Sequence, residues 1–387
     1  MKRVAKFTST RVTPEKAILV AVGKKTRATG WNVESSLEEL EALAKSAGVQ
    51  VVGKIIQKLA RPLHTFYVGT GKLEELQKLK ETLDYTVVIF DDELSPRQQK
   101  NLEDELKTKV IDRTALILDI FAGRALTSEG KLQVELAQHQ YLLPRLAGQW
   151  SHLERLGGGI GTRGPGESQL ETDRRIITTK IRHLEDQLEA VRRHRTLYRS
   201  KRKKGSVPVV SLVGYTNSGK STLLNALSKS SVLVEDRLFS TLDPVTRRVN
   251  IPDFGEILLT DTVGFVNKLP PSIVKAFRAT LEELEEADVL LHVVDITHVN
   301  AAEQSQTVEN ILKDLSLEAK PRITILNKVD LAAKSMEDLS EITGQVKLPA
   351  EEIVSISALK GWGLDKLLDK IVDFLKRNND FTQNQYQ

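Results

Sequence analysis

The sequence of 387 residues contains no cysteine. This absence excludes disulfide bonds, thiolate nucleophiles and cysteine-ligated metal sites, and it favours a reducing compartment. Residues 1–12 lack the apolar segment of a secretory signal. The sequence also lacks any stretch of about 20 apolar residues, the length that a membrane-spanning helix requires. We therefore expect a cytoplasmic protein.

Net charge is also small, at +4 for the whole chain, but it is unevenly distributed. Residues 174–204 carry twelve lysines and arginines against three acidic residues, which gives this segment +9 and leaves −5 for the rest. Local positive charge is typical of a surface that binds a polyanion. A solvated helix face followed by a flexible linker is the alternative, because charged faces are common on exposed helices.

The first third of the chain alternates short β-rich runs with helical stretches. Continuous apolar runs of this kind are typical of strands buried in a parallel sheet. The rhythm predicts an N-terminal α/β domain over residues 1–127. The expected elements are strands at residues 17–22, 49–54 and 85–90, a helix at residues 37–47, and a helix that begins near Lys72.

From residue 128 onward, apolar residues recur at alternating three- and four-residue steps, which is typical of coiled-coil seams. The glycine-rich residues 157–166 cannot hold a helix, and Pro144 should kink or break the first helix. We expect an antiparallel helical hairpin with a glycine-rich tip and a basic linker over residues 128–204. Because the seams can satisfy each other, we expect a monomer. They comprise Leu132, Leu136, His139, Leu143, Leu146, Trp150 and Leu153, then Ile177, Ile181, Leu184, Leu188 and Val191.

Residues 205–377 show a regular α/β pattern that predicts a P-loop GTPase domain, with a flexible tail at residues 378–387. An apolar strand runs into a glycine-rich turn, and a helix follows. Backbone amides of such a turn surround phosphate oxygens. Lys220 can reach the β- and γ-phosphates, and the Ser221 hydroxyl can ligate Mg²⁺. The motif is Gly214, Tyr215, Thr216, Asn217, Ser218, Gly219, Lys220 and Ser221.

Two further segments should complete the phosphate and metal site. Asp261, Thr262, Val263 and Gly264 follow an expected strand, so that Asp261 can support Mg²⁺ and the Gly264 amide can contact the γ-phosphate. A mobile loop should bring a threonine hydroxyl to Mg²⁺ only when the γ-phosphate is present. We expect Thr241 rather than Thr246, because residues 245–251 look like a strand. That loop is Phe239, Ser240, Thr241, Leu242 and Asp243. The expected catalytic residues are Lys220, Thr241 and Gly264, and the metal ligands are Ser221 and Thr241.

The base should be selected by two segments that follow later strands. The Asp330 carboxylate only accepts hydrogen bonds, which suits the N1–H and exocyclic amine of guanine and disfavours adenine. A backbone amide near Ala358 can donate to the guanine O6. The first segment is Asn327, Lys328, Val329 and Asp330, and the second is Ser357, Ala358 and Leu359. Four elements in this order predict GTP and GDP with Mg²⁺ as the ligands.

Two positions in the site are unusual. Ras-like GTPases carry a glutamine after the DxxG glycine to orient the attacking water, whereas this chain has Phe265. A phenyl ring cannot hydrogen-bond to water, so we expect slow hydrolysis until a partner or another group positions it. Asn217 can offer a carbonyl oxygen to a monovalent cation such as K⁺ beside the phosphates, or it can cap the loop locally.

With these motifs the chain resembles the HflX family of translational GTPases. The resemblance is carried by residues 130–138, by the glycine-rich segment that leads into residues 163–171, and by the hydrophobic residue after the DxxG motif. It implies an N-terminal α/β subdomain, a helical hairpin and a G domain. It also implies binding to the large ribosomal subunit and its rRNA, and the splitting or rescue of stalled ribosomes.

Alternative functions remain open from the sequence alone. A GTP-timed factor for RNA remodelling or ribosome assembly is one, and a nucleotide-gated scaffold with negligible turnover is another. Because some family members are reported to bind ATP through the N-terminal region, Gly69, Thr70, Gly71 and Lys72 also require an interpretation. They lack the P-loop spacing, so we expect a helix-start turn there.

Overall fold

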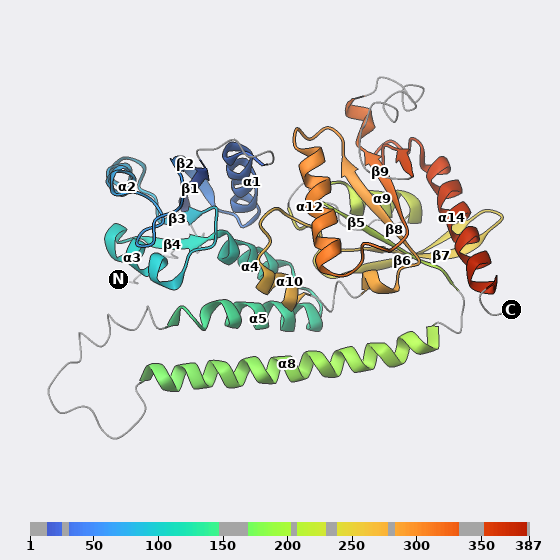
Figure 1. Cartoon of the computed structure of the whole chain (residues 1–387), viewed down its shortest axis with the longest axis horizontal. Helices are drawn as coiled ribbons and strands as arrows, with labels where there is room; N and C mark the ends of the chain where they lie inside the picture. Colours follow the sequence, from blue (N-terminus) through green and yellow to red (C-terminus); the bar gives the residue numbers. More distant parts are fainter. Residues whose placement is uncertain are drawn as a thin grey trace, which may run out of the picture. The chain divides into compact units, whose positions relative to one another are not determined.

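The computed structural model describes residues 14–24, 31–146, 169–202, 207–229, 238–277, 283–332 and 352–384. The chain divides into two compact units, of which the first holds residues 1–28 and 32–116 and the second holds residues 29–31 and 117–387. Figure 1 identifies the elements of both units. The predicted glycine-rich tip at residues 157–166 lies outside the described residues. Among the described helices, none combines the length and apolarity needed to cross a bilayer.

The first unit is an α/β domain built on a four-stranded parallel sheet, as predicted. Its strand order is β2-β1-β3-β4. All four residues of β3 are buried, as expected for a parallel sheet covered on both faces. The elements are β1 (Lys16–Lys24), α1 (Val33–Ser46), β2 (Gln50–Leu59), α2 (Thr70–Leu83), β3 (Val87–Phe90), α3 (Pro96–Leu106) and β4 (Lys109–Asp112).

The first two helices of this unit begin in different ways. The Asn32 side chain accepts a hydrogen bond from the Ser35 amide at the start of α1, which satisfies an otherwise unpaired amide. Helix α2 begins at Thr70 after Gly69, and the ammonium of Lys72 lies 2.6 Å from the Glu75 carboxylate. The segment expected to be a helix-start turn thus begins an ordinary helix.

A buried arginine joins three elements of the first unit. Arg113 is 1% exposed and donates from Nη1 to Asp91 at 2.8 Å and from Nη2 to Glu39. Asp91 also accepts from the Ser36 hydroxyl at 2.7 Å. Buried charges are tolerated only when they are paired and hydrogen-bonded. The arginine therefore ties β3 to α1 from the first residue of α4 (Arg113–Arg124).

The second unit begins with a helical part that follows the predicted seams. Helix α5 (Ser128–Leu142) ends just before Pro144, and α8 (Gln169–Arg202) packs against it. An ion pair of 2.5 Å joins Lys180 to Glu135. Along α8, the predicted seam residues are buried or partly exposed, whereas the arginines beside them are exposed. Helix α5 also buries a second face, at Gln133, Val134, Ala137 and Tyr141, that the seam did not predict.

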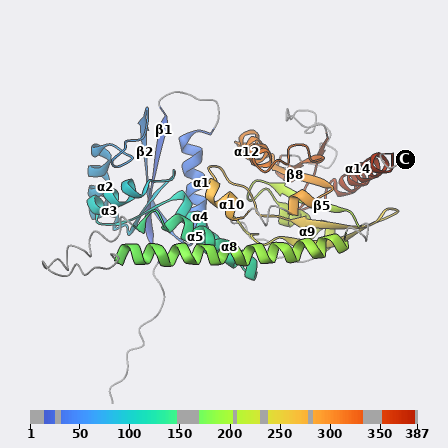
Figure 2. The same ribbon diagram turned by 60° about the horizontal axis from the view of Figure 1, so that its bottom comes forward.

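The rest of the second unit is a six-stranded sheet with strand order β10-β9-β8-β5-β7-β6. Every neighbouring pair is parallel except β6 with β7. Figure 2 shows it from a second direction. The elements are β5 (Val209–Gly214), α9 (Lys220–Ser228), β6 (Val245–Ile251), β7 (Gly255–Asp261), α10 (Pro271–Ala276), β8 (Val289–Asp295), α12 (Ala301–Asp314), β9 (Arg322–Asn327), η2 (Val329–Leu331), β10 (Ile353–Ser355) and α14 (Leu364–Asn384).

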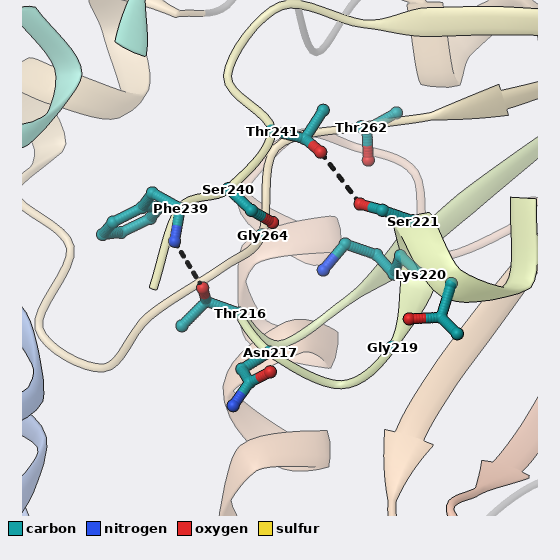
Figure 3. Close-up of a pocket in the computed structure, with 11 residues that line it drawn as sticks. Thr216, Asn217, Gly219, Lys220, Ser221, Phe239, Ser240, Thr241, Thr262 and Gly264 are labelled. Atoms are coloured by element: carbon teal, nitrogen blue, oxygen red, sulfur yellow. Dashed lines mark hydrogen bonds between the residues drawn. The ribbon is translucent and has the colours of Figure 1, made fainter. Parts of the chain in front are cut away.

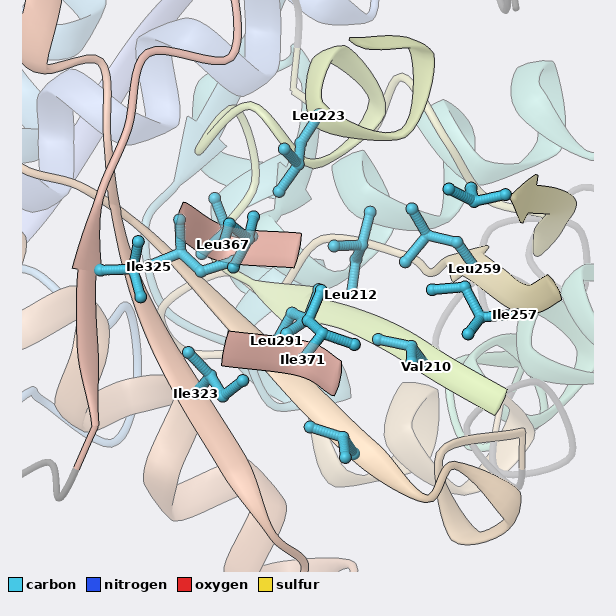
Figure 4. Packing of buried hydrophobic residues seen from close by; sticks show 14 of the residues in the cluster. Val210, Leu212, Leu223, Ile257, Leu259, Leu291, Ile323, Ile325, Leu367 and Ile371 are labelled. Atoms are coloured by element: carbon cyan, nitrogen blue, oxygen red, sulfur yellow. The ribbon is translucent and has the colours of Figure 1, made fainter. Parts of the chain in front are cut away.

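One hydrophobic cluster anchors the central strands of this sheet. Side chains of β5, β7, β8 and β9 meet those of α9 and α14, as Figure 4 shows. Every residue of β8 is buried, which requires cover on both faces. Burial on this scale stabilises by roughly 25 cal/mol per Å² of apolar surface, so the sheet is the rigid base on which the connecting loops rest.

Two predicted boundaries differ from the structure. Helix α8 continues through Arg202 into the expected linker, and α14 continues through Asn384 into the expected tail at residues 378–387. Neither stretch contains proline or glycine. An established helix therefore has no local reason to stop at those positions, even where the residues are polar.

Removing the Arg113 side chain should loosen the first unit. In an Arg113→Leu variant, the Asp91 and Glu39 carboxylates lose their buried partner, and we expect a loss of about 3–5 kcal/mol. Hydrogen exchange of the β3 and β4 amides in the full chain measures this local stability. Lys72→Leu, which breaks a more exposed ion pair, is the control and should cost less than about 1 kcal/mol. Equal exchange in the two variants would contradict the role of Arg113.

Candidate nucleotide-binding site

The predicted motifs gather at one edge of the second sheet. The strands β5, β7, β9 and β10 are parallel to one another, so the loops after them leave the sheet at its carboxyl edge. Ligands of open α/β sheets bind at this edge. Figure 3 shows the pocket formed there. It is lined by Thr216, Asn217, Gly219, Lys220, Ser221, Thr222, Phe239, Ser240, Thr241, Thr262 and Gly264.

The turn after β5 has the backbone of a phosphate-binding loop. Gly219 has φ +97°, in the left-handed region that favours glycine. The Lys220 ammonium points into the turn (Figure 3) and donates to the carbonyl oxygens of Gly214 at 3.2 Å and Tyr215 at 2.8 Å. Burial lowers the pKa of Lys220 to about 8, against the opposing effect of Asp261. A phosphate in this turn would supply the negative charge that the buried ammonium lacks.

Three oxygen-bearing side chains meet beside this turn. The Ser221 hydroxyl donates to Asp261 at 2.6 Å, and the Thr241 hydroxyl lies 2.9 Å from Ser221 and 3.0 Å from Asp261. Burial raises the pKa of Asp261, while Lys220 and the two hydroxyls act in the opposite direction. The second carboxylate oxygen of Asp261 is buried and has no hydrogen-bond partner among the described residues. A set of hard oxygen donors suits Mg²⁺, so Ser221 and Thr241 fit as its ligands.

The structure separates the two threonine candidates. Thr246 lies on β6, and its hydroxyl is 2.9 Å from that of Thr260 on the neighbouring strand β7. The Thr246 hydroxyl is therefore engaged within the sheet. Thr241, in contrast, belongs with Ser221 and Asp261 to the group of oxygen-bearing side chains that we call the oxygen cluster. Of the predicted loop, Phe239 and Ser240 also line the pocket. Neither Leu242, which is buried, nor Asp243 lines it.

The segment after β7 lies directly against the phosphate loop. A Cβ atom on Gly264 would come within 2.7 Å of the Thr216 Cα, so only glycine permits this approach. Phe265 is 1% exposed; its amide donates to Gly214 at 3.1 Å, and its carbonyl accepts from the Thr216 amide at 2.7 Å. Phe265 therefore joins two loops through its backbone. Thr262 donates its hydroxyl to the Leu212 carbonyl inside the sheet at 2.6 Å, and Val263 is buried.

The segments expected to select the base contact each other. The Ser357 hydroxyl donates to the Asp330 carboxylate at 2.6 Å, which orients that carboxylate at the end of the site. Lys328 has φ +66° and forms an ion pair of 2.7 Å with Asp295 at the end of β8. Asp295 was missed in the sequence, although its place directly after residues 289–294, which are apolar except for His292, was a usable signal. Val329 and Ala358 are buried, and Leu359 is 79% exposed.

Asn327 has a role that its motif did not predict. Its side-chain amide donates to the Ser218 carbonyl at 2.9 Å, and its oxygen accepts from the Ala358 amide at 3.0 Å. A Cβ on Gly219 would lie 2.2 Å from the same amide nitrogen. Asn327 thus ties the phosphate loop to the segment after β10. The spacing of the two motifs along the chain carries no signal for this contact.

Three family models match the chain in sequence order. Residues 34–122 match the N-terminal region of GTP-binding GTPases, and residues 124–202 match their middle region. Residues 209–328 match a model described as a 50S ribosome-binding GTPase. The last match spans the phosphate loop, the oxygen cluster and Asn327, and so covers most of the nucleotide pocket.

Curated proteins named GTPase HflX are similar to almost the whole chain. The protein of Caldanaerobacter subterraneus is 50% identical and is aligned over 92% of this chain and 80% of its own length. The one from Alkalihalophilus pseudofirmus is 53% identical over 81% of this chain and 74% of its own. The one from Escherichia coli is 44% identical over 88% and 79%.

Exchanging one acceptor for a donor should alter base selection. In Asp330→Asn, the carboxylate loses its charge-assisted bonds to the N1–H and amine of guanine, and we expect guanosine diphosphate affinity to fall about 10- to 100-fold. Xanthosine diphosphate, which carries a carbonyl in place of the amine, should bind the variant better than the parent. Competition titration with a fluorescent nucleotide measures both affinities.

The matched control is Asp253→Asn, at an exposed position with φ +61° where asparagine fits well. It should leave both affinities unchanged. If Asp330→Asn weakened both diphosphates equally, Asp330 would not face the base.

Proposed function

The chain belongs to the HflX family of GTPases, and from this premise we propose that it uses its GTP cycle to act on the large ribosomal subunit and to split or rescue stalled ribosomes. GTP binding and hydrolysis follow from the family and from the GTPase match over residues 209–328. The single observation that supports the ribosomal partner is that match, because its model is described as a 50S ribosome-binding GTPase. Such a partner and the absence of cysteine both fit a cytoplasmic protein.

The rRNA contact that we propose lies on α8. Its apolar seam faces inward, and the basic residues between the seam positions are exposed. Exposed guanidinium and ammonium groups bind phosphate oxygens without reading sequence. The basic residues with described side chains are Arg174, Arg175, Lys180, Arg182, Arg192 and Arg193. The tip residues Arg155 and Arg163 lie outside the described residues.

We propose a switch that depends on Mg²⁺. Ser221 and Thr241 would hold Mg²⁺, and the Gly264 amide would contact the γ-phosphate, only in the GTP state, so the loops that carry Thr241 and Gly264 would be released after hydrolysis. The ring of Phe265 is buried and cannot hydrogen-bond to the attacking water, so another group must orient that water. Turnover is therefore slow in the free protein and faster on the subunit.

Asn217 lines the pocket with φ +61° and is our candidate oxygen donor for K⁺. The protein acts as a monomer, because α5 and α8 cover each other's seam.

GTP turnover with different partners tests this function. We expect slow hydrolysis by the purified full chain, stimulation by large ribosomal subunits, and little stimulation by free RNA, because a polyanion alone does not orient the catalytic water. Phosphate release is measured with the subunit concentration varied. Equal rates in all three conditions would remove the ribosome from the mechanism while leaving the GTP site in place.

Charge reversal on α8 should weaken binding to the subunit. For the double change Arg192→Glu and Arg193→Glu, we expect lower affinity and a shallower dependence on salt. The slope of log affinity against log salt concentration should decrease by about one for each phosphate that the variant no longer binds. Sedimentation with large subunits at several KCl concentrations measures both.

The matched control reverses Arg247 and Arg248, two adjacent exposed arginines on β6. It changes the net charge by the same amount, so a purely long-range electrostatic effect would lower the affinity of both variants equally. That outcome would count against a contact through α8.

A further inference from the structure

The loop that carries Thr241 is held at both sides by the helical part of the same unit. We call residues 238–244 the switch loop. Asp243, two residues after Thr241, contacts the start of α5, and Phe239, two residues before it, contacts α4. Both contacts lie within the second unit. Thr241 therefore lies in a short span of backbone between two residues whose side chains contact α5 and α4.

The first anchor is a carboxylate at the beginning of a helix. Asp243 accepts from the backbone amides of Leu126 at 2.8 Å and Thr127 at 2.9 Å, and its other oxygen accepts from the Thr127 hydroxyl. Thr127 is itself the N-cap of α5 and accepts from the Gly130 amide at 2.9 Å. A negative charge is favoured at this end of a helix dipole. The three bonds from Asp243 bind the switch loop to the first turn of α5.

Gly130 makes the approach of this carboxylate possible. A Cβ atom at position 130 would lie 2.3 Å from the Asp243 Oδ1, which is closer than non-bonded atoms can come. Glycine inside a helix is otherwise unfavourable relative to alanine. Its presence in the first turn of α5 is thus explained by the contact with the switch loop and not by the helix itself.

The second anchor is aromatic. The Phe239 ring turns away from the pocket (Figure 3) and lies edge-on to Phe121 of α4, with ring centroids 4.7 Å apart. Phe121 also packs edge-on against Phe277, at 4.9 Å. The Phe239 amide donates to the Thr216 hydroxyl of the phosphate loop at 2.9 Å. Phe239 adopts φ +58°, an unusual value for a residue with a side chain, so packing must hold it there.

We propose that Asp243 and Phe239 are positioning residues for GTP hydrolysis, through which α5 and α4 hold the Thr241 hydroxyl at the Mg²⁺ site. This inference rests on the proposed GTP site but not on the ribosome. Thr241 serves Mg²⁺ only in the triphosphate state. Loss of an anchor therefore weakens the triphosphate state selectively and leaves the diphosphate state as it was.

The coupling must also act in the opposite direction. If α5 stabilises the triphosphate-bound switch loop, the bound triphosphate stabilises the contact with α5 by the same factor. The amides of Leu126 and Thr127, which donate to Asp243, report this directly. They exchange more slowly with a non-hydrolysable GTP analogue bound than with GDP bound.

Gly130→Ala tests the proposal from the side of the helix. Alanine favours the helix, so a purely structural role for this contact predicts a more stable α5 and unchanged catalysis. The proposal predicts that the new methyl group displaces Asp243, with about tenfold lower affinity for the GTP analogue, a similar drop in kcat and unchanged GDP affinity. Gly123→Ala is the matched control, because a Cβ there meets no atom within 4 Å.

Asp243→Ala should give the same selective loss, and Asp243→Asn, which keeps one acceptor oxygen, a smaller one. Because both sites act through one contact, Gly130→Ala combined with Asp243→Ala should lose no more than either change alone. All measurements use the full chain without ribosomes, with Mg²⁺ titrated in each nucleotide state. The Mg²⁺ requirement should rise only with the triphosphate.

Two outcomes would overturn the proposal: unchanged analogue binding in Gly130→Ala, or equal losses for GDP and the analogue. A parent protein that bound neither nucleotide would instead refute the GTP site itself. If ribosomal subunits did not stimulate GTP turnover but the variants still lost affinity for the GTP analogue alone, the ribosomal role would be refuted. The assignment of the positioning residues would be unaffected.

Discussion

The site depends on the burial of both faces of a parallel sheet. Because helices and the hydrophobic cluster cover the central strands β5, β8 and β9, polar chemistry is confined to the edge where these strands end. The shared strand direction then brings together loops that are far apart in the sequence. Lys220 lies near Asp261 at this edge, and Asp330 contacts Ser357 further along it. No local sequence signal pairs these residues.

Hydrogen bonds between the loops fix the positions of the residues at this edge. Asn327 joins the phosphate loop to the segment after β10, and Phe265 joins the phosphate loop to the segment after β7. Gly219 and Gly264 permit approaches that a Cβ would block. Some residues that the sequence motifs assign to the ligand thus form contacts between loops of the protein instead. The Asp243 contact extends the same principle from the pocket to α5.

Sequence patterns predicted those features of the structure that local forces determine. The apolar runs predicted the buried strands, and the seam on α8 predicted which of its side chains face inward, because the helical period alone selects that face. Patterns were less informative where an element has two partners. Helix α5 packs α8 on one face and buries Gln133 and Tyr141 on another, and a single seam cannot describe both. Polar composition also failed to predict that α14 continues to Asn384.

The sequence by itself determined the fold class, the order of the motifs and the kind of ligand, because strand and helix periodicity and the phosphate-loop spacing are local properties of the chain. Only the tertiary structure decided which residues touch. It placed Thr241 rather than Thr246 beside Ser221, gave Asn327 and Phe265 their joining roles, and turned Asp243 away from the pocket toward Thr127. These contacts depend on distances between segments tens of residues apart, which are set by how the sheet and helices pack.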